Sequence, residues 1–246
     1  MAPRRYLVTT ASTQAEALRW AKEGAVHGSR VVAGSQTEGV GRLDHAWSSP
    51  AGGLYLSMIL RDLTRPSSLF PLLVGAQLRE RLRSRWSIVT AVKWPNDLVV
   101  PGPTARYRKL AGVLVDRVAP MEADPKIVIG LGINVASPAS RFPAGLRPSV
   151  VGLDEIAQSP PTLADVEEVA AGATESAWTI AESVDPSGPL LSDLRSSLFG
   201  VGQRARVDGR PVGRIRGVDF DGALLVEEAG HTDRILAGSL TIEEAS

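Results

Sequence analysis

The sequence predicts an α/β (α+β) protein with a mixed central sheet, flanking helices and a small C-terminal β-barrel. Three observations support this fold class. Short apolar segments of strand-like composition alternate with segments that have helical spacing. One of them, residues 126–135 (KIVIGLGINV), is apolar on both faces, which is typical of a strand in the middle of a sheet. After Gly200 the chain changes to short strands with Asp-Gly turns.

The first elements are a strand and a capped helix. Residues 5–10 (RYLVTT) predict the strand. Thr13 and Glu16 have the spacing of a capping box, which predicts a helix over residues 14–23. Gly24 suits the C-terminal end of that helix, because glycine adopts the left-handed conformation found there.

The middle of the chain alternates strands with one helix. Residues 30–34 (RVVAG) and 52–60 (GGLYLSMIL) predict strands, and residues 68–85 have helical spacing with a basic C-terminal end. Three further strand segments follow, at residues 90–94, 108–118 and 126–135. A long glycine-rich loop, residues 34–47 (GSQTEGVGRLDHAW), lies between the predicted strands at residues 30–34 and 52–60.

Residues 161–183 predict the clearest helix. Thr162 and Asp165 form its capping box, and its apolar residues recur at helical spacing. The expected buried stripe consists of Val166, Val169, Ala173, Ala177 and Ile180. Residues 184–191 (VDPSGPLL) break the helical pattern.

The last part of the chain predicts a separate β-domain. A short helix over residues 192–199 leads to Gly200, and tight turns are expected at Asp208-Gly209 and Asp221-Gly222. We therefore expect two domains, residues 1–199 and residues 200–246.

Composition excludes several functions. Lys+Arg and Asp+Glu both total 27, so zero net charge predicts no specific DNA binding and no attraction to an anionic membrane. The chain has no cysteine, which removes thiol nucleophiles and disulfides, and its three separated histidines, taken as surface residues, show no metal-ligand spacing. Without a secretory signal or an apolar run of about 18 residues, we expect a cytoplasmic location.

Polar clusters interrupt the apolar framework at strand ends, where α/β sheets gather ligands. They are residues 9–14, 34–47, 93–97, 108–112 and 130–135. Gly39 and Gly41 let the backbone approach an anion, and Arg42 adds a fork for phosphate or carboxylate. Lys93 and Lys109 are single lysines in apolar strands. Such cations suit a reaction between two anions, such as a carboxylate attacking a nucleotide phosphate.

Taken in order, the motifs ST, GxGRxxxxW, KWPND, KLAGVL and GLGINV resemble those of biotin protein ligases over most of residues 5–200. The resemblance implies a catalytic domain like that of class II synthetases and lipoate ligases, with an SH3-like C-terminal domain. It also implies the activity. Biotin and ATP form biotinyl-5′-AMP with Mg²⁺, and biotin is then transferred to one lysine of a biotin carboxyl carrier domain. Homodimers are common in the family.

The resemblance assigns roles to individual residues. The catalytic residues are Arg42, Lys109 and Asp97, the last as a Mg²⁺ ligand or as a base for the acceptor amine. The biotin-binding residues are Ser12, Thr13, Gln14, Gln36, Gly41, Arg42, Lys109 and Gly112. The ATP- or adenylate-binding residues are Gly39, Arg42, Trp47, Asn96, Lys109 and Asn134. Each has a structural explanation when taken singly, so the assignment depends on their joint occurrence.

Two departures from the family pattern matter. Many bacterial members have an arginine-rich loop, GRGRRGRxW, whereas only Arg42 remains of its arginines here, so we expect weaker retention of the adenylate. The catalytic pattern begins near residue 5, so we expect no N-terminal helix-turn-helix. Two alternative functions stay open: a lipoate–protein ligase, and a sensor that binds biotin or adenylate without catalysis.

Overall fold

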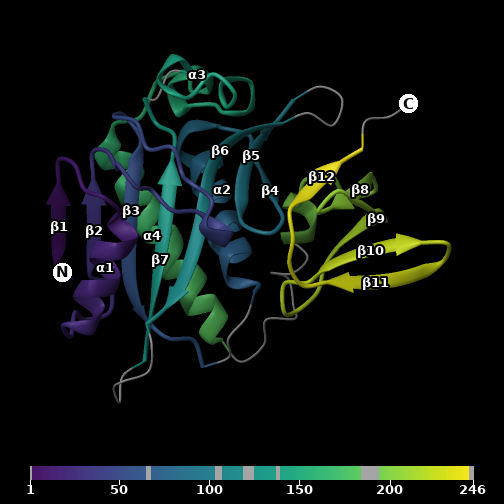
Figure 1. Cartoon of the computed structure of the whole chain (residues 1–246), viewed down its shortest axis with the longest axis horizontal. Coiled ribbons are helices and arrows are strands. Elements are labelled where there is room, and N and C mark those ends of the chain that lie inside the picture. Colours follow the sequence, from purple (N-terminus) through teal and green to yellow (C-terminus); the bar gives the residue numbers. More distant parts are fainter. Residues whose placement is uncertain are drawn as a thin grey trace.

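A computed structural model describes residues 2–64, 68–102, 107–118, 125–136, 139–183 and 194–243. These residues form a mixed sheet of seven strands and an antiparallel sheet of five strands, with helices packed on both faces of the first (Figure 1). The predicted fold class is confirmed. The predicted break at residues 184–191 lies outside the described residues, and of the short helix expected at 192–199, residues 194–197 are helical.

The larger sheet has the order β1-β2-β3-β7-β6-β5-β4. Its strands are β1 (Arg4–Leu7), β2 (Arg30–Ala33), β3 (Leu54–Arg61), β4 (Ala91–Lys93), β5 (Asp97–Pro101), β6 (Tyr107–Arg117) and β7 (Lys126–Ile133). Only β1 and β2 pair in parallel among the described strands. The central place of β7 confirms its prediction from two apolar faces. Strand β5 was not predicted, because its first residue belongs to a polar motif.

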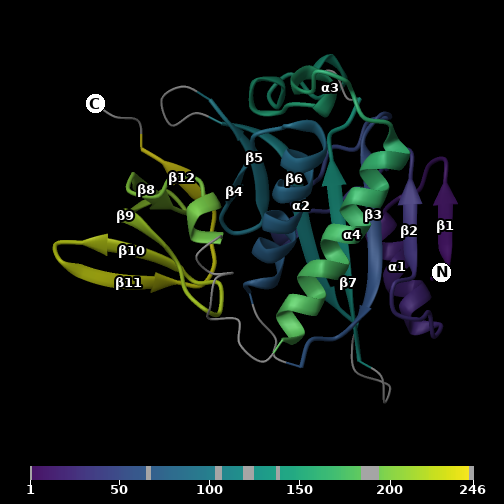
Figure 2. The same ribbon diagram turned by 180° about the vertical axis from the view of Figure 1, so that it is seen from behind.

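Helices cover the two faces of this sheet unequally (Figure 2). They are α1 (Thr13–Lys22), α2 (Phe70–Trp86), α3 (Leu153–Ile156) and α4 (Leu163–Glu182), with 3-10 turns at Arg42–Asp44, Ala139–Arg141 and Arg147–Ser149. Helices α2 and α4 pack together over one face and share its large apolar core. Helix α1 lies on the other face, where fully buried Ala17 and Ala21 allow close approach to the sheet. The rest of that face stays available for a binding site.

One helix start differs from its prediction. Ser12, not Thr13, is the N-cap of α1: the Ser12 hydroxyl accepts from the Ala15 N–H at 3.4 Å, and Thr13 is the first helical residue. The predicted Thr13–Glu16 capping box is therefore wrong. The Thr13 N–H donates to the Gln36 side chain instead, so a tertiary contact has replaced the local one.

The predicted start and buried face of α4 are confirmed. Thr162 and Asp165 exchange the two hydrogen bonds of a capping box. Val166, Val169, Ala173 and Ala177 are buried, and Ile180 is partly buried against the same core.

His27, expected at the surface, is partly exposed and makes three side-chain contacts. Its Nδ1 accepts the Arg61 N–H at 3.1 Å, and its Nε2 lies 3.2 Å from a Glu175 carboxylate oxygen. The ring packs edge-on against Trp178, with centroids 4.6 Å apart.

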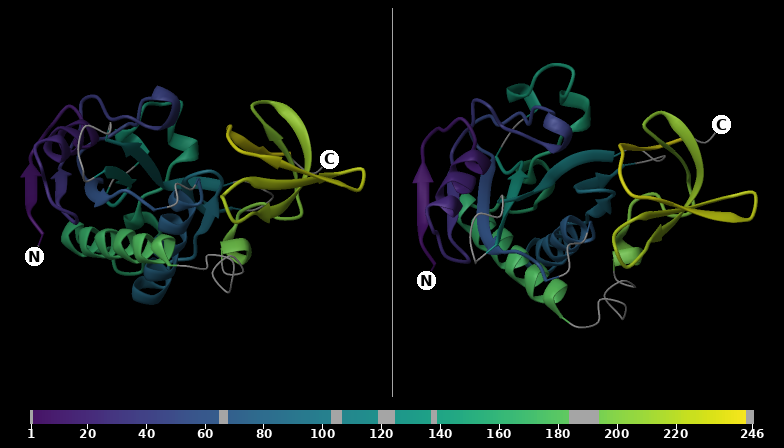
Figure 3. Two further views of the ribbon diagram at one scale, coloured as in Figure 1. Left: turned by 90° about the horizontal axis from the view of Figure 1, so that it is seen from below. Right: turned by 60° about the horizontal axis from the view of Figure 1, so that its bottom comes forward.

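The second sheet has the order β11-β10-β9-β8-β12 and lies beside β4 (Figure 1), on the side of the molecule opposite β1 (Figure 3). Its strands are β8 (Arg204–Val207), β9 (Arg210–Val218), β10 (Leu224–Glu228), β11 (His231–Ile235) and β12 (Leu240–Ile242). Asp208-Gly209 and Asp221-Gly222 connect consecutive strands, as predicted. The buried Trp94 indole N–H donates to the Gly222 carbonyl at 3.0 Å, which fixes this sheet to the first. Among the described helices, none has the length and apolar character needed to cross a bilayer.

Candidate active site

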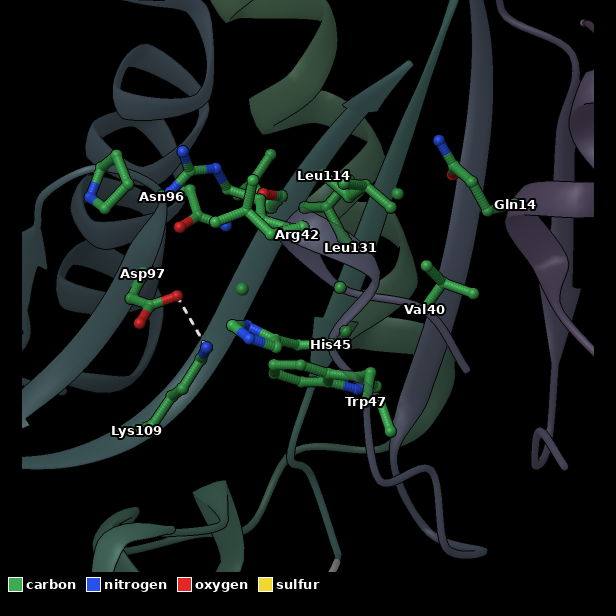
Figure 4. A pocket seen from close by; sticks show the side chains of 18 of the residues that line it. Gln14, Val40, Arg42, His45, Trp47, Asn96, Asp97, Lys109, Leu114 and Leu131 are labelled. Carbon is green, nitrogen blue, oxygen red and sulfur yellow. Dashed lines mark hydrogen bonds and ion pairs between the residues drawn. The ribbon is translucent and has the colours of Figure 1, made fainter. Parts of the chain in front are cut away.

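A cavity of about 200 Å³ opens on the face of the sheet that carries α1 (Figure 4). Eleven of the predicted site residues line it: Ser12, Thr13, Gln14, Gln36, Gly41, Arg42, Trp47, Asn96, Asp97, Lys109 and Gly112. They come from the start of α1, the glycine-rich loop, the 93–97 motif and β6. Arg42 and Lys109 therefore face one cavity, although they lie 67 positions apart in the chain.

One end of the cavity is a connected chain of polar side chains. Gln36 donates from Nε2 to the Ser49 hydroxyl at 2.8 Å, and Ser49 donates to the Trp47 carbonyl at 3.1 Å. These bonds fix the Gln36 amide, so its Oε1 accepts both the N–H and the O–H of Thr13, at 2.8 and 3.0 Å.

Ser57 and Gln14 continue the same chain. The Ser57 hydroxyl lies 3.0 Å from both the Thr13 hydroxyl and Gln14 Oε1. Since the Thr13 proton is used on Gln36, Thr13 has only lone pairs left to offer. The amide oxygens of Gln14 and Gln36 likewise only accept. This end of the cavity therefore presents mainly acceptors, and it favours a ligand that carries N–H donors.

Glycines form the floor beneath these side chains. A Cβ on Gly132 of β7 would lie 2.5 Å from the Trp47 indole, and one on Gly112 of β6 would lie 3.0 Å from it. A Cβ on Gly130 would lie 2.6 Å from Gln14 Oε1. The absence of side chains at these three positions lets Trp47 and Gln14 pack directly on the sheet.

The other end of the cavity is charged. The Lys109 ammonium lies 2.7 Å from Asp97 Oδ1 and 4.8 Å from the centre of the Trp47 ring (Figure 4). The pairing follows from the fold, because β5 and β6 are hydrogen-bonded neighbours and the two residues leave them toward the same side. A lysine between a carboxylate and an aromatic face is held in place while its charge still reaches the cavity.

Lys93 adds a second ammonium that is only 6% exposed. It lines the cavity and lies 5.1 Å from the centre of the Tyr107 ring. Burial lowers the pKa of Lys93, Asp97 opposes that shift, and Lys109 adds to it. An amine of lowered pKa held beside a second cation is typical of a site that receives an anionic ligand.

Arg42 lies in the 3-10 turn of the loop, next to Leu43, which adopts a left-handed φ of 54°. Burial lowers the pKa of Arg42, and the carboxylates of Asp97 and Asp208 oppose that shift. Its guanidinium therefore stays charged and partly desolvated. The second sheet closes this side of the cavity with Gly238, Ser239 and Leu240.

Two predicted site residues are not among those lining the cavity, Gly39 and Asn134. Gly39 serves the loop itself: its carbonyl accepts the Trp47 N–H, and a Cβ there would lie 2.5 Å from the Trp47 carbonyl oxygen. Asn134 is 2% exposed, and its amide donates to the Lys109 carbonyl at 3.2 Å. Asn134 thus holds the strand that carries Lys109.

Several lining residues were not assigned to the site from the sequence. They are Lys93, Ser57, Gly130, Gly132, Leu114, His45 and the second-sheet segment 238–240. The sequence carries a signal for Lys93, because a charged residue in an apolar strand is unusual. It carries none for Ser57, because a serine within an apolar strand such as β3 is common. Within the described ranges, no three His, Cys, Asp or Glu side chains come together as a metal site.

Comparisons with known proteins agree with this geometry. The model of the biotin/lipoate A/B protein ligase family matches residues 7–134. The bifunctional ligase/repressor BirA of Bacillus spizizenii is 28% identical over 96% of this chain and 73% of its own length. The biotin–[acetyl-CoA-carboxylase] ligase of Mycobacterium tuberculosis is 28% identical over 94% of this chain and 85% of its own.

Among solved structures, the biotin protein ligase of Aquifex aeolicus in complex with biotin and ATP matches with a TM-score of 0.83. The alignment covers 100% of both chains at 24% sequence identity, which establishes the shared fold. The family match extends over more than half of the chain and includes the loop, both lysine motifs and the central strand. The chain belongs to the biotin/lipoate A/B protein ligase family.

Proposed function

We propose that the protein is a biotin–protein ligase, which uses ATP to attach biotin to one lysine of a biotin carboxyl carrier domain. The acceptor-rich end of the cavity carries this proposal. The ureido ring of biotin has two N–H groups that can donate to Gln14 Oε1 and to Thr13 Oγ1, while Gln36 Oε1 accepts from Thr13 and orients it. The Ser12 hydroxyl, which lines the same end, can donate to the ureido carbonyl.

The same observation argues against lipoate as the substrate. The dithiolane ring of lipoate has no N–H, so it would leave the remaining lone pairs of Gln14 Oε1 and Thr13 Oγ1 without a donor from the ligand. An unmade hydrogen bond to a buried polar group costs about 1–3 kcal/mol. Sites built to bind a polar group reject analogues that lack it by large factors.

The charged end suits the joining of two anions. In the first step the biotin carboxylate attacks the α-phosphorus of ATP, a new C–O–P linkage forms, and the bond to pyrophosphate breaks. Arg42, Lys93 and Lys109 offset the repulsion between the reactants and stabilise the charge on the phosphate oxygens. In the second step the neutral amine of the acceptor lysine attacks the carbonyl carbon, AMP leaves with the electron pair of the broken C–O bond, and the attacking nitrogen loses one proton to water.

Asn96 and Asp97 are the residues that would hold Mg²⁺ in this cavity. The Asn96 Nδ2 donates to the Val113 carbonyl at 2.7 Å, so its Oδ1 could serve as an oxygen ligand, and Asp97 would supply a carboxylate from the same cavity wall. Mg²⁺ is usually held by one or two carboxylates together with substrate phosphates, for which it supplies charge neutralisation. Asp97 also pairs with Lys109 and so keeps that ammonium oriented toward the cavity.

We also propose the wider setting of this activity. The loop of residues 34–47 closes over the adenylate and keeps water from it. The chain comprises a catalytic domain, residues 1–199, and a C-terminal domain, residues 200–246. The protein acts in the cytoplasm as a homodimer and does not bind an operator, which its zero net charge supports.

Incubation with biotin, ATP, Mg²⁺ and a biotin carboxyl carrier domain tests the proposal. The expected result is the mass increase of one biotinyl group on a single lysine, together with pyrophosphate release. Lipoate in place of biotin should release little pyrophosphate, and omission of ATP should abolish labelling. Tight biotin binding without any labelling would instead identify a sensor, and a gel-shift on a biotin-operon promoter at low salt tests the absence of operator binding.

A further inference from the structure

Asp116 of β6 holds the side-chain amide of Gln14 in place. It lies two residues after the KLAGVL motif and belongs to none of the family motifs. Gln14 Nε2 donates to Asp116 Oδ2 at 2.9 Å and to the Val128 carbonyl at 3.1 Å. Gln14 is only 6% exposed, so its amide depends on these two protein partners. Asp116 leaves β6 on the same face as Gly112 and Leu114, which line the cavity, and so lies at its polar end.

Both partners of the Gln14 nitrogen can only accept hydrogen bonds. An ionised carboxylate and a backbone carbonyl have no proton to offer, so a flipped amide would place its oxygen against two other oxygens. The Gln14 oxygen must therefore face the Ser57 hydroxyl and the cavity, where Ser57 Oγ lies 3.0 Å away. An asparagine, serine or threonine at position 116 would lack this effect, because each can also donate.

We propose that Asp116 is a positioning residue that locks Gln14 Oε1 toward the ligand, and so requires an N–H donor on the ring bound at this end of the cavity. The inference rests on the proposed function, since it assigns that donor to the ureido ring of biotin. Asp116 does not touch the ligand. It acts through the orientation of the Gln14 amide.

The test uses Asp116→Asn, which keeps the size of the side chain but adds a donor. Its amide can satisfy Gln14 in either orientation, so Gln14 is no longer locked. We expect the Kd of biotin, measured by calorimetry, and its KM to rise about tenfold, in line with the loss of a buried hydrogen bond. The kcat at saturating biotin should stay within about twofold, because the charged end is unchanged. Asp116→Glu, which keeps an acceptor-only carboxylate, should retain tighter binding than Asp116→Asn.

Selectivity gives a readout that a purely structural role would not move. The two cyclic carbamate analogues of biotin, in which oxygen replaces one or the other ureido N–H, present an acceptor where biotin has a donor. The wild-type protein should disfavour at least one analogue by about tenfold or more relative to biotin. In Asp116→Asn that ratio should shrink, since a flipped Gln14 can donate to the ring oxygen. Asp233→Asn, an exposed aspartate of β11, is the matched control and should leave the ratio unchanged.

The outcomes separate this inference from the proposed function. If the wild-type protein neither binds biotin nor labels a carrier domain, the proposed function itself is wrong. If the wild-type protein is a biotin ligase and Asp116→Asn keeps both the biotin Kd and the selectivity ratio within twofold, only the role of Asp116 is overturned. Should Asp116→Asn fail to fold, Asp116→Ser makes the same comparison, because its hydroxyl also both donates and accepts.

Discussion

Gly132→Ala should separate ligand binding from stability. Gly132 lies on the central strand β7, with β3 on one side and β6 on the other, so its backbone cannot move away. The added Cβ would lie 2.5 Å from the Trp47 ring, against about 3.5–4.0 Å for an ordinary carbon contact. Trp47 must move by about 1 Å, and it can, because it is only half-buried and belongs to the loop.

Overpacking of this size costs about 1–3 kcal/mol. Because the Trp47 ring moves and the sheet does not, the unliganded protein loses little stability. Most of the overpacking free energy should instead weaken ligand binding, which requires the Trp47 ring in its wild-type position. Trp47 is assigned to the adenylate, but its displaced ring also narrows the cavity that holds biotin, so the KM of biotin should rise by about 5- to 150-fold. The melting temperature should fall by only a few degrees, because each kcal/mol corresponds to about 2–4 °C in a chain of this size.

Pyrophosphate release at varied biotin concentration measures the KM, and a thermal melt measures stability. Gly75→Ala in α2 is the matched control. Its Cβ would meet the two Val92 methyl groups at 3.6 Å, an ordinary contact, and alanine favours a helix over glycine by about 1 kcal/mol. The control should therefore keep its biotin KM and melt no lower than the wild type. A Gly132→Ala protein with an unchanged biotin KM would refute the placement of Trp47 against the ligand.

Three further predictions concern the charged groups. Arg42→Ala and Lys109→Ala should each lower the rate of adenylate formation by about 10²–10³-fold and leave the melting temperature unchanged. A wild-type rate in either variant would refute the catalytic role of the replaced residue. Lys93→Met should raise the melting temperature and slow adenylate formation. Burial lowers the pKa of Lys93, so the unfolded chain holds this proton more tightly than the folded protein. The wild-type protein should therefore gain stability as the pH rises toward the ordinary lysine pKa of 10.5. The same gain in the Lys93→Met protein would contradict this explanation. Glu167 accepts from Arg4 at 2.7 Å, which lowers its pKa, so Glu167→Gln should cost about 2 kcal/mol at neutral pH. The stabilisation by Glu167 is present above pH 4.5 and is lost as the pH falls. Urea unfolding should therefore show that the wild-type protein and Glu167→Gln differ less in free energy of unfolding at acidic pH than at neutral pH.

The sequence alone determined the local features whose cause is local. Apolar runs and helical spacing predicted every strand of the larger sheet except β5, and both long helices, because the spacing of apolar residues along the chain decides which face of an element is buried. The Asp-Gly pairs predicted two hairpin turns, because few other dipeptides adopt the backbone that these turns need. The joint order of motifs predicted the family.

Only the tertiary structure decided which polar atoms meet. Thr13 has a capping-box sequence, yet its N–H donates to the side chain of Gln36. The fold places this loop residue next to the start of α1. Asn134, predicted from its motif as a nucleotide contact, donates to the Lys109 carbonyl, a bond that the sequence did not predict. Asp116 carried no signal in the sequence, because its effect arises from a hydrogen bond to a residue 102 positions away. Local propensity cannot specify such contacts, since they depend on which strands become neighbours and toward which face each side chain points.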